Sequence, residues 1–154
     1  MTEESQHEKI LIIEDDQKIA MALAIRLKAN GYSASIAPDA LAGASEARAI
    51  KPDLILLDIS LPGGNGFQLA ETFLRMPETS GTPVIFITAS KNPELLKKVM
   101  ELGAVGLFEK PFDAEELHSA IDRKFNSITD LLNAGEHSVA TNHLNDEEYP
   151  HHRR

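Results

Sequence analysis

Cysteine is absent from this 154-residue sequence, and it also lacks long apolar runs and an excess of positive charge. Without cysteine, disulfides, cysteine-ligated zinc sites and thiol nucleophiles are excluded. No apolar run approaches the roughly 20 residues of a membrane-spanning helix, and the polar, acidic start at residues 1–9 is unlike a signal peptide. The formal net charge of −9 disfavours binding to nucleic acid and to anionic membranes. We therefore expect a cytoplasmic protein.

The apolar residues follow two alternating periods along the chain. Short runs typical of strands lie at 10–13, 32–37, 54–57, 83–87 and 104–108. Helical patterns follow them at about 19–30, 39–50, 67–74, 93–102 and 114–134. They are bounded by glycine, proline and capping residues, among them the candidate N-caps Asp39 and Asn92. This alternation predicts one α/β domain, in which helices cover both faces of a parallel sheet.

Charged and hydroxyl side chains follow four of the expected strands. The first strand is followed by the acidic residues 14–16, and the third ends in Asp58 after an unbroken apolar run. The fourth leads to Thr88 and the fifth to Lys110, whereas the second brings only Ala37, as expected for an outer strand. Because the carboxyl ends of parallel strands share one edge of a sheet, where ligands bind, we expect these groups to meet.

The grouped carboxylates predict a magnesium site. Carboxylates at one point repel one another unless a cation neutralises them, and Mg²⁺ prefers oxygen ligands. With the cation bound, Asp58 could attack phosphorus as a nucleophile. Thr88, Lys110 and backbone N–H groups near Ser60 and Ala89 could then bind the phosphoryl oxygens, and the small Ala89 leaves room for the group. The predicted chemistry is phosphoryl transfer to Asp58.

These residues resemble the receiver domain of bacterial two-component response regulators, which work in histidine–aspartate phosphorelays, and a single-domain, chemotaxis-regulator-like member in particular. The resemblance covers about residues 9–125, and it is specific because five blocks occur in the family's order. It implies a doubly wound, five-stranded parallel sheet of flavodoxin-like order 2-1-3-4-5. The blocks are Ile12-Ile13-Glu14-Asp15-Asp16, Leu56-Leu57-Asp58, Leu61-Pro62 with Gly66, Pro83-Val84-Ile85 with Thr88-Ala89, and Gly103-Ala104 with Lys110-Pro111-Phe112.

The resemblance also implies roles for the acidic residues. Asp58 would be the phosphoacceptor, receiving the group from a phosphohistidine on a histidine kinase or a histidine phosphotransfer protein. Asp15 and Asp58 would bind Mg²⁺ directly, with the backbone carbonyl of Ser60 as a third ligand. Glu14 would act mainly through a bound water.

The implied switch departs from the family at one position. Thr88 and Lys110 would bind the phosphoryl oxygens, and the Lys110-Pro111 bond would be cis. The family usually has Tyr or Phe three residues before the lysine, where this sequence has Leu107. The neighbouring Phe108 should point to the opposite face of its strand. We therefore expect that no rotating aromatic ring reports the switch, and the coupling is either weaker or carried by the loop after Thr88.

Simpler structural roles compete with some of these assignments. Asp16 is better explained as a helix N-cap than as a metal ligand. An aspartate before proline and glycine is often a turn residue, but the matching groups at the other strand ends favour a functional role for Asp58. Ser60 and Ser90 flank the site. The sequence is equally consistent with two roles for them: tuning the hydrolysis of the phosphoryl group, or serving as ordinary loop serines.

We expect three segments: a polar lead at 1–8, a receiver domain at 9–134 with an extended last helix, and a polar, disordered tail at 135–154. The leading hypothesis is a single-domain, phosphorylation-dependent switch, because too few residues follow Phe125 for a DNA-reading domain. Its partners would be the phosphodonor and a downstream protein, with no nucleic acid and no membrane, and it would be a monomer or weak homodimer. Alternatives are the receiver portion of a longer regulator or hybrid kinase, and a receiver that dimerises through its last helix.

A metabolic enzyme on the same fold fits the sequence less well. The acidic residues 14–16 would repel a flavin phosphate, and an aspartate-nucleophile phosphatase would have a second aspartate where Ser60 stands. Fold alone does not separate these classes. We expect a phosphoacceptor protein whose catalysis is limited to Mg²⁺-dependent self-phosphorylation and slow autodephosphorylation.

Overall fold

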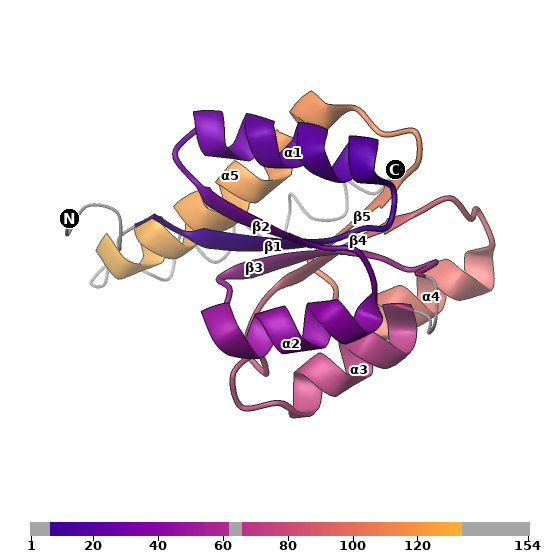
Figure 1. The fold of residues 1–154 in the computed structure, drawn as a ribbon. Helices are drawn as coiled ribbons and strands as arrows, with labels where there is room; N and C mark the ends of the chain where they lie inside the picture. The colour runs from indigo at the N-terminus through magenta and orange to yellow at the C-terminus, as the bar shows by residue number, and fades with distance from the viewer. Residues whose placement is uncertain (1–6, 62–65, 134–154) are drawn as a thin grey trace. The chain divides into compact units, whose positions relative to one another are not determined.

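Five parallel strands form a single sheet at the centre of the fold (Figure 1). They are β1 (Lys9–Ile13), β2 (Ser33–Ala37), β3 (Leu54–Asp58), β4 (Val84–Thr88) and β5 (Gly106–Glu109). The structure is a computed structural model that describes residues 7–61 and 66–133, with side chains up to residue 126. The strand order is β2-β1-β3-β4-β5, which confirms the predicted doubly wound α/β fold of flavodoxin-like order.

A helix follows each strand: α1 (Gln17–Ala29), α2 (Ala40–Ile50), α3 (Gly66–Arg75), α4 (Pro93–Glu101) and α5 (Ala114–Asn133). α1 lies on one face of the sheet, and α2 and α3 lie on the other (Figure 1). The chain divides into two compact units between Ala114 and Glu115. The strands and α1 to α4 belong to the first unit, and α5 is described by itself. The domain extent of 9–134 stays a prediction, and the predicted tail at 135–154 lies outside the described residues.

Side-chain caps begin three of the helices where the sequence predicts. Asp16 accepts hydrogen bonds from the backbone N–H groups of Lys18 and Ile19 at the start of α1. Asp39 caps α2, and Asn92 caps α4 ahead of a proline in the first turn. These caps satisfy backbone donors that a helix leaves unpaired at its N-terminus. They also fix where each helix leaves the carboxyl edge of the sheet.

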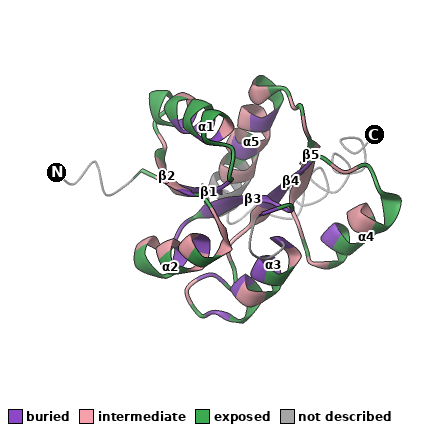
Figure 2. Cartoon of the chain, turned by 45° about the vertical axis from the view of Figure 1, so that its right-hand side comes forward, coloured by how far each residue is buried: buried purple, intermediate pink, exposed green. Residues whose placement is uncertain are grey.

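Burial is greatest in the middle of the sheet (Figure 2). All residues of β3 are buried, whereas the edge strands β2 and β5 are mostly half-buried. On the face that α2 and α3 cover, Leu57 of β3 and Phe86 of β4 belong to one apolar cluster with residues of those helices. Because side chains alternate along a strand, the neighbouring residues face the α1 side. The central strands are therefore fixed from both faces.

Three strands begin later than the sequence pattern predicts, and β4 does so by one residue, at Val84 instead of Pro83. β2 begins at Ser33 instead of residue 32, and β5 spans Gly106–Glu109 instead of 104–108. The reason is the same for β2 and β5, because the backbone N–H group of the earlier residue closes the preceding helix. Tyr32 donates to the Leu27 carbonyl at 3.0 Å, and Ala104 donates to the Val99 carbonyl at 3.4 Å. Each closure follows a glycine of positive φ, as in a Schellman motif.

In the described part of the chain, no helix has both the length and the apolar character that crossing a bilayer requires.

Candidate functional site

Three carboxylates gather at the carboxyl edge of the sheet. Glu14 and Asp15 directly follow β1, and Asp58 is the last residue of β3. One oxygen from each of the three lies within 4.8 Å of the others. Glu14 and Asp58 are 1% and 2% exposed, whereas Asp15 is exposed to solvent. Two of the three negative groups are therefore buried side by side, which is costly unless positive charge compensates them.

The strand register explains why these residues meet. Ile13 of β1 pairs with Leu57 of β3, so the residues that directly follow this pair, Glu14 and Asp58, lie at the same level of the edge. The backbone N–H of Glu14 donates to the Ala37 carbonyl at 3.0 Å, which continues the pairing of β1 with β2. The edge geometry thus follows from the parallel pairing that the sequence predicts.

Lys110 supplies the compensating charge. Its Nζ donates to Glu14 Oε2 at 3.1 Å and to Asp58 Oδ2 at 3.0 Å. Its backbone N–H donates to the Thr88 carbonyl at 2.7 Å, and the bond to Pro111 is cis, as the resemblance implies. The sequence predicted Lys110 at the site, but it did not predict that the side chain bridges both buried carboxylates.

The pKa directions agree with this arrangement. Burial raises the pKa of the Glu14 carboxyl above its ordinary value, against the opposing hydrogen bonds from Asp16 N–H and Lys110. Burial acts to lower the pKa of Lys110, but its hydrogen bonds to Asp58 and Glu14 outweigh burial and leave that pKa raised. Lys110 is therefore charged at neutral pH, and it acts as an internal counter-ion for the two buried carboxylates.

The residues fit a hard divalent cation. Glu14 Oε2 accepts from Asp16 N–H at 3.0 Å and from Lys110, but Glu14 Oε1 is buried and finds no hydrogen-bond partner among the described residues. A buried carboxylate oxygen without a partner is rare, and an ion or a water held by one would satisfy it. Carboxylate oxygens are also the ligands that Mg²⁺ prefers. The backbone carbonyl of Ser60 as a further ligand stays a prediction.

The loop after β4 links Thr88 to the start of α4 through consecutive side-chain turns. The buried Thr88 Oγ1 accepts from the N–H of Ser90 at 2.9 Å. Ser90 Oγ accepts from the N–H of Asn92 at 3.1 Å, and Asn92 Oδ1 accepts from the N–H of Glu94 at 2.9 Å. Thr88 stands where the sequence places it, but sequence reasoning did not find this series of turns. Ala89 is exposed in the same loop, and its role beside a phosphoryl group stays a prediction.

The two residues before the end of β5 lie on opposite faces, as predicted. Leu107 is half-buried against the apolar cluster that contains Phe86. A Cβ built on Gly106 would lie 3.8 Å from the ring of Phe108, so Phe108 lies on the Gly106 side of the strand. Phe108 therefore does not replace the aromatic residue that Leu107 lacks.

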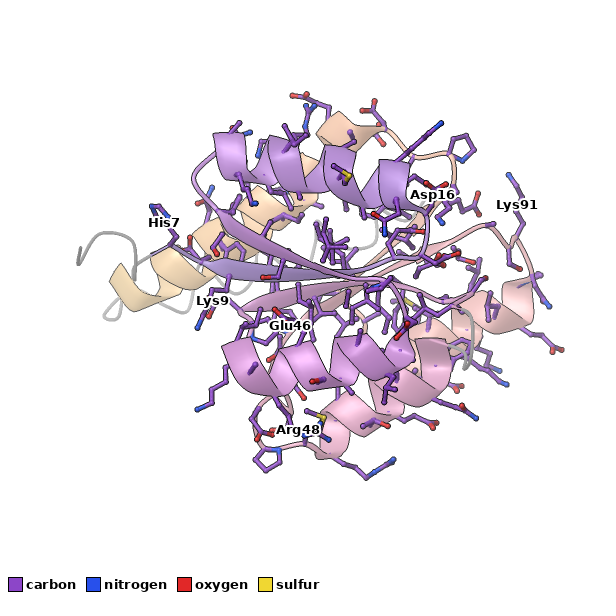
Figure 3. The ribbon with its side chains drawn as sticks, viewed as in Figure 1. His7, Lys9, Asp16, Glu46, Arg48 and Lys91 are labelled. Carbon is purple, nitrogen blue, oxygen red and sulfur yellow. The ribbon has the colours of Figure 1, made fainter. Side chains whose placement is uncertain are left out.

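One contact at the rim of the site was not predicted from the sequence. Lys91 Nζ lies 3.4 Å from Glu109 Oε1, and both side chains are well exposed. The pair joins the loop after β4 to the last residue of β5. Figure 3 labels Lys91 and Asp16 near the carboxyl edge, with His7 and Lys9 at the opposite edge. Sequence spacing gives no signal for such a pair, because one partner comes from a loop and the other from a strand that lies further along the chain.

Residues 10–122 match the family of response regulator receiver domains. The chain is 32% identical to the DNA-binding dual master transcriptional regulator RpaA of Synechocystis over 134 residues, which cover 87% of this chain and 56% of that protein. It is 38% identical to the transcriptional activator protein IrlR of Burkholderia pseudomallei over 71% of this chain and 46% of that protein. The chain thus spans about half the length of the curated relatives it matches.

Solved structures show the same likeness. A CheY-like response regulator receiver domain protein from Methanospirillum hungatei superposes with a TM-score of 0.74 at 27% identity, covering 79% of this chain and 95% of that one. The fold and the acidic edge therefore define a phosphoacceptor signalling module on a flavodoxin-like sheet. The chain belongs to the response regulator receiver domain family of two-component signalling.

Proposed function

We propose that this chain is a signalling switch in which Asp58 accepts a phosphoryl group from a phosphohistidine. The observation that carries the proposal is the setting of the Asp58 carboxylate. It is buried at the end of β3, Oδ1 accepts from the N–H of Ser60 at 3.0 Å, and Oδ2 accepts from Lys110 Nζ at 3.0 Å. In the step proposed, a bond forms between an Asp58 carboxylate oxygen and phosphorus as the phosphorus–nitrogen bond of the donor breaks, and the imidazole leaves.

Glu14, Asp15, Asp58 and the Ser60 carbonyl would hold Mg²⁺. When bound, the cation offsets negative charge on both the carboxylate and the incoming phosphoryl group. The protein's own part is to hold the carboxylates together, which the register of β1 with β3 and the bridging Lys110 do. Lys110 and the Thr88 hydroxyl would bind phosphoryl oxygens as these replace the present partners of both side chains.

The phosphorylated state would be transmitted through the loop after β4. Thr88 Oγ1 now accepts from the N–H of Ser90, at the first of the turns that reach α4. A hydroxyl that turns toward a phosphoryl group changes that first turn, and the later turns at Ser90 and Asn92 pass the change to the N-terminus of the helix. With Leu107 on β5, this path needs no aromatic ring. The slow loss of the phosphoryl group would return the loop to its present form.

A second candidate function is favoured by the relatives. The curated proteins named above are DNA-binding or transcriptional regulators about twice the length of the match. The chain would then be the receiver portion of a longer regulator, and its output would pass to a further domain instead of a separate protein. In either form we place the module in the cytoplasm, with a histidine kinase or phosphotransfer protein as its donor. Dimerisation through the last helix would use the side chains of residues 128–132, which lie outside those that the structure describes.

The test is intact mass after incubation with acetyl phosphate, with and without Mg²⁺. The wild type should gain a phosphate adduct only with Mg²⁺, and Asp58→Asn should gain none. Asp53→Asn is a matched control, because Asp53 precedes the same strand at the opposite edge, where its carboxylate accepts from the N–H of Lys9. An adduct that persists in Asp58→Asn, or a wild type that binds neither phosphate nor beryllofluoride with Mg²⁺, would overturn the proposal.

A further inference from the structure

The first residue of α3, Gly66, lies directly against the backbone of the turn that carries Asp58. A Cβ built on Gly66 would lie 2.6 Å from the Asp58 carbonyl oxygen, 2.6 Å from Ile59 Cα and 3.1 Å from the Ile59 carbonyl oxygen. The backbone N–H of Gly66 also donates to the Ile59 carbonyl at 2.7 Å. Any side chain at this position would push against backbone atoms, which cannot rotate away as a side-chain end can.

The requirement for glycine here is steric. Among the described glycines, Gly31 and Gly103 have a positive φ, but Gly66 does not. Gly66 is helical, and alanine is a better helix former than glycine. If the backbone of Asp58 and Ile59 were not in the way, helix propensity alone would favour alanine over glycine at position 66.

The turn that Gly66 contacts is also held from the β4 side. The N–H of Ile59 donates to the Ile87 carbonyl at 3.0 Å. The next residue, Ser60, donates its N–H to Asp58 Oδ1 at 3.0 Å. A shift of the Ile59 backbone away from α3 would therefore move the Ser60 amide and carbonyl relative to the Asp58 carboxylate.

We propose that Gly66 is a positioning residue for the phosphoacceptor. Its missing Cβ lets α3 begin directly on the backbone of Asp58 and Ile59, and this contact fixes the Asp58 carboxylate relative to Glu14 and Lys110. The proposal deepens the proposed function and rests on it, because it assigns Gly66 a part in binding Mg²⁺ and in phosphorylation. Misplaced supporting groups commonly reduce metal affinity and catalysis without contacting the metal or substrate.

The experiment compares Gly66→Ala with two matched glycine variants of the whole chain. In Gly43→Ala, on α2, the new Cβ would lie 2.9, 3.2 and 3.3 Å from Cδ1, Cγ2 and Cγ1 of Ile13, which are side-chain atoms and not backbone. In Gly81→Ala, no described atom outside residues 80–82 lies within 4 Å of the new Cβ. For each variant we would measure the Mg²⁺ dissociation constant by calorimetry, the initial rate of phosphorylation by acetyl phosphate and unfolding in urea. Hydrogen exchange of the Ser60 amide in metal-free protein gives a readout that depends on neither ion nor phosphate.

We expect Gly66→Ala to bind Mg²⁺ about 10-fold more weakly and to lower the phosphorylation rate by a similar factor. Its Ser60 amide should exchange faster than the loss of global stability accounts for. Gly43→Ala should change urea unfolding but leave the Mg²⁺ constant within about twofold, and Gly81→Ala should change neither. An Mg²⁺ constant for Gly66→Ala within twofold of wild type would overturn the proposal. So would an equal weakening in Gly43→Ala at equal loss of stability.

A second variant covers the case in which Gly66→Ala does not fold. Phe67→Ala removes the ring whose centroid lies 6.1 Å from that of Phe86, and so loosens the first turn of α3 from β4 without a clash. Like Gly66→Ala, it should raise the dissociation constant for Mg²⁺. An unchanged constant in this variant would count against the proposal. A wild type that takes up neither Mg²⁺ nor phosphate would defeat the proposed function and this inference together. A competent wild type with unaffected variants would defeat this inference alone.

Discussion

β3 and β5 each deliver a charged side chain to the site, but they are held in different ways. β3 pairs with a strand on each side and every one of its residues is buried, so Asp58 is fixed by packing. β5 pairs with β4 at the edge of the sheet, and its residues are half-buried or exposed. The side chain of Lys110 is 21% exposed and is held by its two carboxylate partners. The proposed nucleophile thus lies at the end of a fully buried central strand, whereas Lys110, which would bind the phosphoryl group, follows a less buried edge strand.

The largest expected effect is on the free energy of unfolding, and it compares the two leucines that pair with Phe86 from either side. In the sheet, Phe86 pairs with Leu57 of β3 on one side and with Leu107 of β5 on the other. Leu57→Ala should lower the free energy of unfolding by about 2–5 kcal/mol, because it leaves a fully enclosed cavity. Leu107→Ala should lower it by about 1 kcal/mol, because the side chain is only partly buried. Urea unfolding measures both, and equal losses would contradict the contrast between the strands.

Glu14 gives the next largest effect, and it has the opposite sign. Glu14→Gln should raise the free energy of unfolding of the metal-free protein by about 1–3 kcal/mol, because a buried, partly unpaired carboxylate is replaced by a neutral amide. Burial raises the folded-state pKa of Glu14, so its contribution is most favourable below the unfolded pKa and is lost as pH rises through the folded pKa.

The measurement is urea unfolding without Mg²⁺ at several pH values. The stability gain from Glu14→Gln should be greatest at neutral pH and should shrink as pH falls toward the unfolded pKa of a glutamate. The same variant should lose part of the stabilisation that Mg²⁺ gives the wild type. A destabilised variant at neutral pH would show that the charged form of Glu14 is favoured by its partners despite burial.

Ser90 tests whether the loop after β4 carries the signal. Ser90→Ala removes the Oγ that accepts from the N–H of Asn92, and should cost about 0.5–1.5 kcal/mol of stability. The variant should have a larger effect on the response of α4 to a phosphoryl analogue than on stability. Beryllofluoride with Mg²⁺ should shift the amide resonances of Glu94 and Leu95 in the wild type, and much less in this variant. Ser90→Thr keeps a hydroxyl and should restore the shifts; shifts of wild-type size in Ser90→Ala would show that another path couples Thr88 to α4.

The rim ion pair should have the smallest effect. Lys91→Ala breaks the exposed contact with Glu109, and exposed pairs of this kind contribute about 0.2–1 kcal/mol. The loss should disappear at high salt, because screening weakens exposed pairs. Lys97→Ala, at an exposed lysine of α4, is the control. Urea unfolding at low and high ionic strength gives the comparison, and a salt-independent loss would point to packing by the Lys91 stem instead of its charge.

The sequence predicted the central strands and the helix starts well, because their signals lie in consecutive or nearby residues. The unbroken apolar run before Asp58 predicted a buried strand, and parallel pairing then placed Glu14 beside it. Caps such as Asp39 and Asn92 were predicted because their signals lie within a few residues of the helix they begin. Local pattern is therefore sufficient wherever the neighbouring residues in the chain also determine the structure.

The features that escaped prediction depend on groups distant in sequence or shared between elements. The helical pattern at 67–74 counts Leu74 among its apolar positions, but this side chain is 50% exposed. Periodicity does not show how wide a face of the helix the sheet covers. The early closure of α4 by Ala104 uses an amide that the strand pattern assigned to β5. The bridge from Lys110 to Glu14 and the contact of Gly66 with Asp58 are seen only in the folded structure, because the partners are far apart in the sequence or meet through the backbone. Family motifs point to these residues, but the motifs do not show what the residues touch.

The lysine bridge has a consequence for how the protein would respond to its ionic surroundings. Because Lys110 already balances part of the charge of Glu14 and Asp58, we expect the chain to fold without a metal ion. Magnesium would then raise the free energy of unfolding of a domain that is already folded. Above the dissociation constant, this gain increases with the logarithm of the free magnesium concentration. The gain would be about 2.7 kcal/mol at roughly 100 times the dissociation constant. The melting temperature of the unphosphorylated protein would thus rise with the concentration of free magnesium.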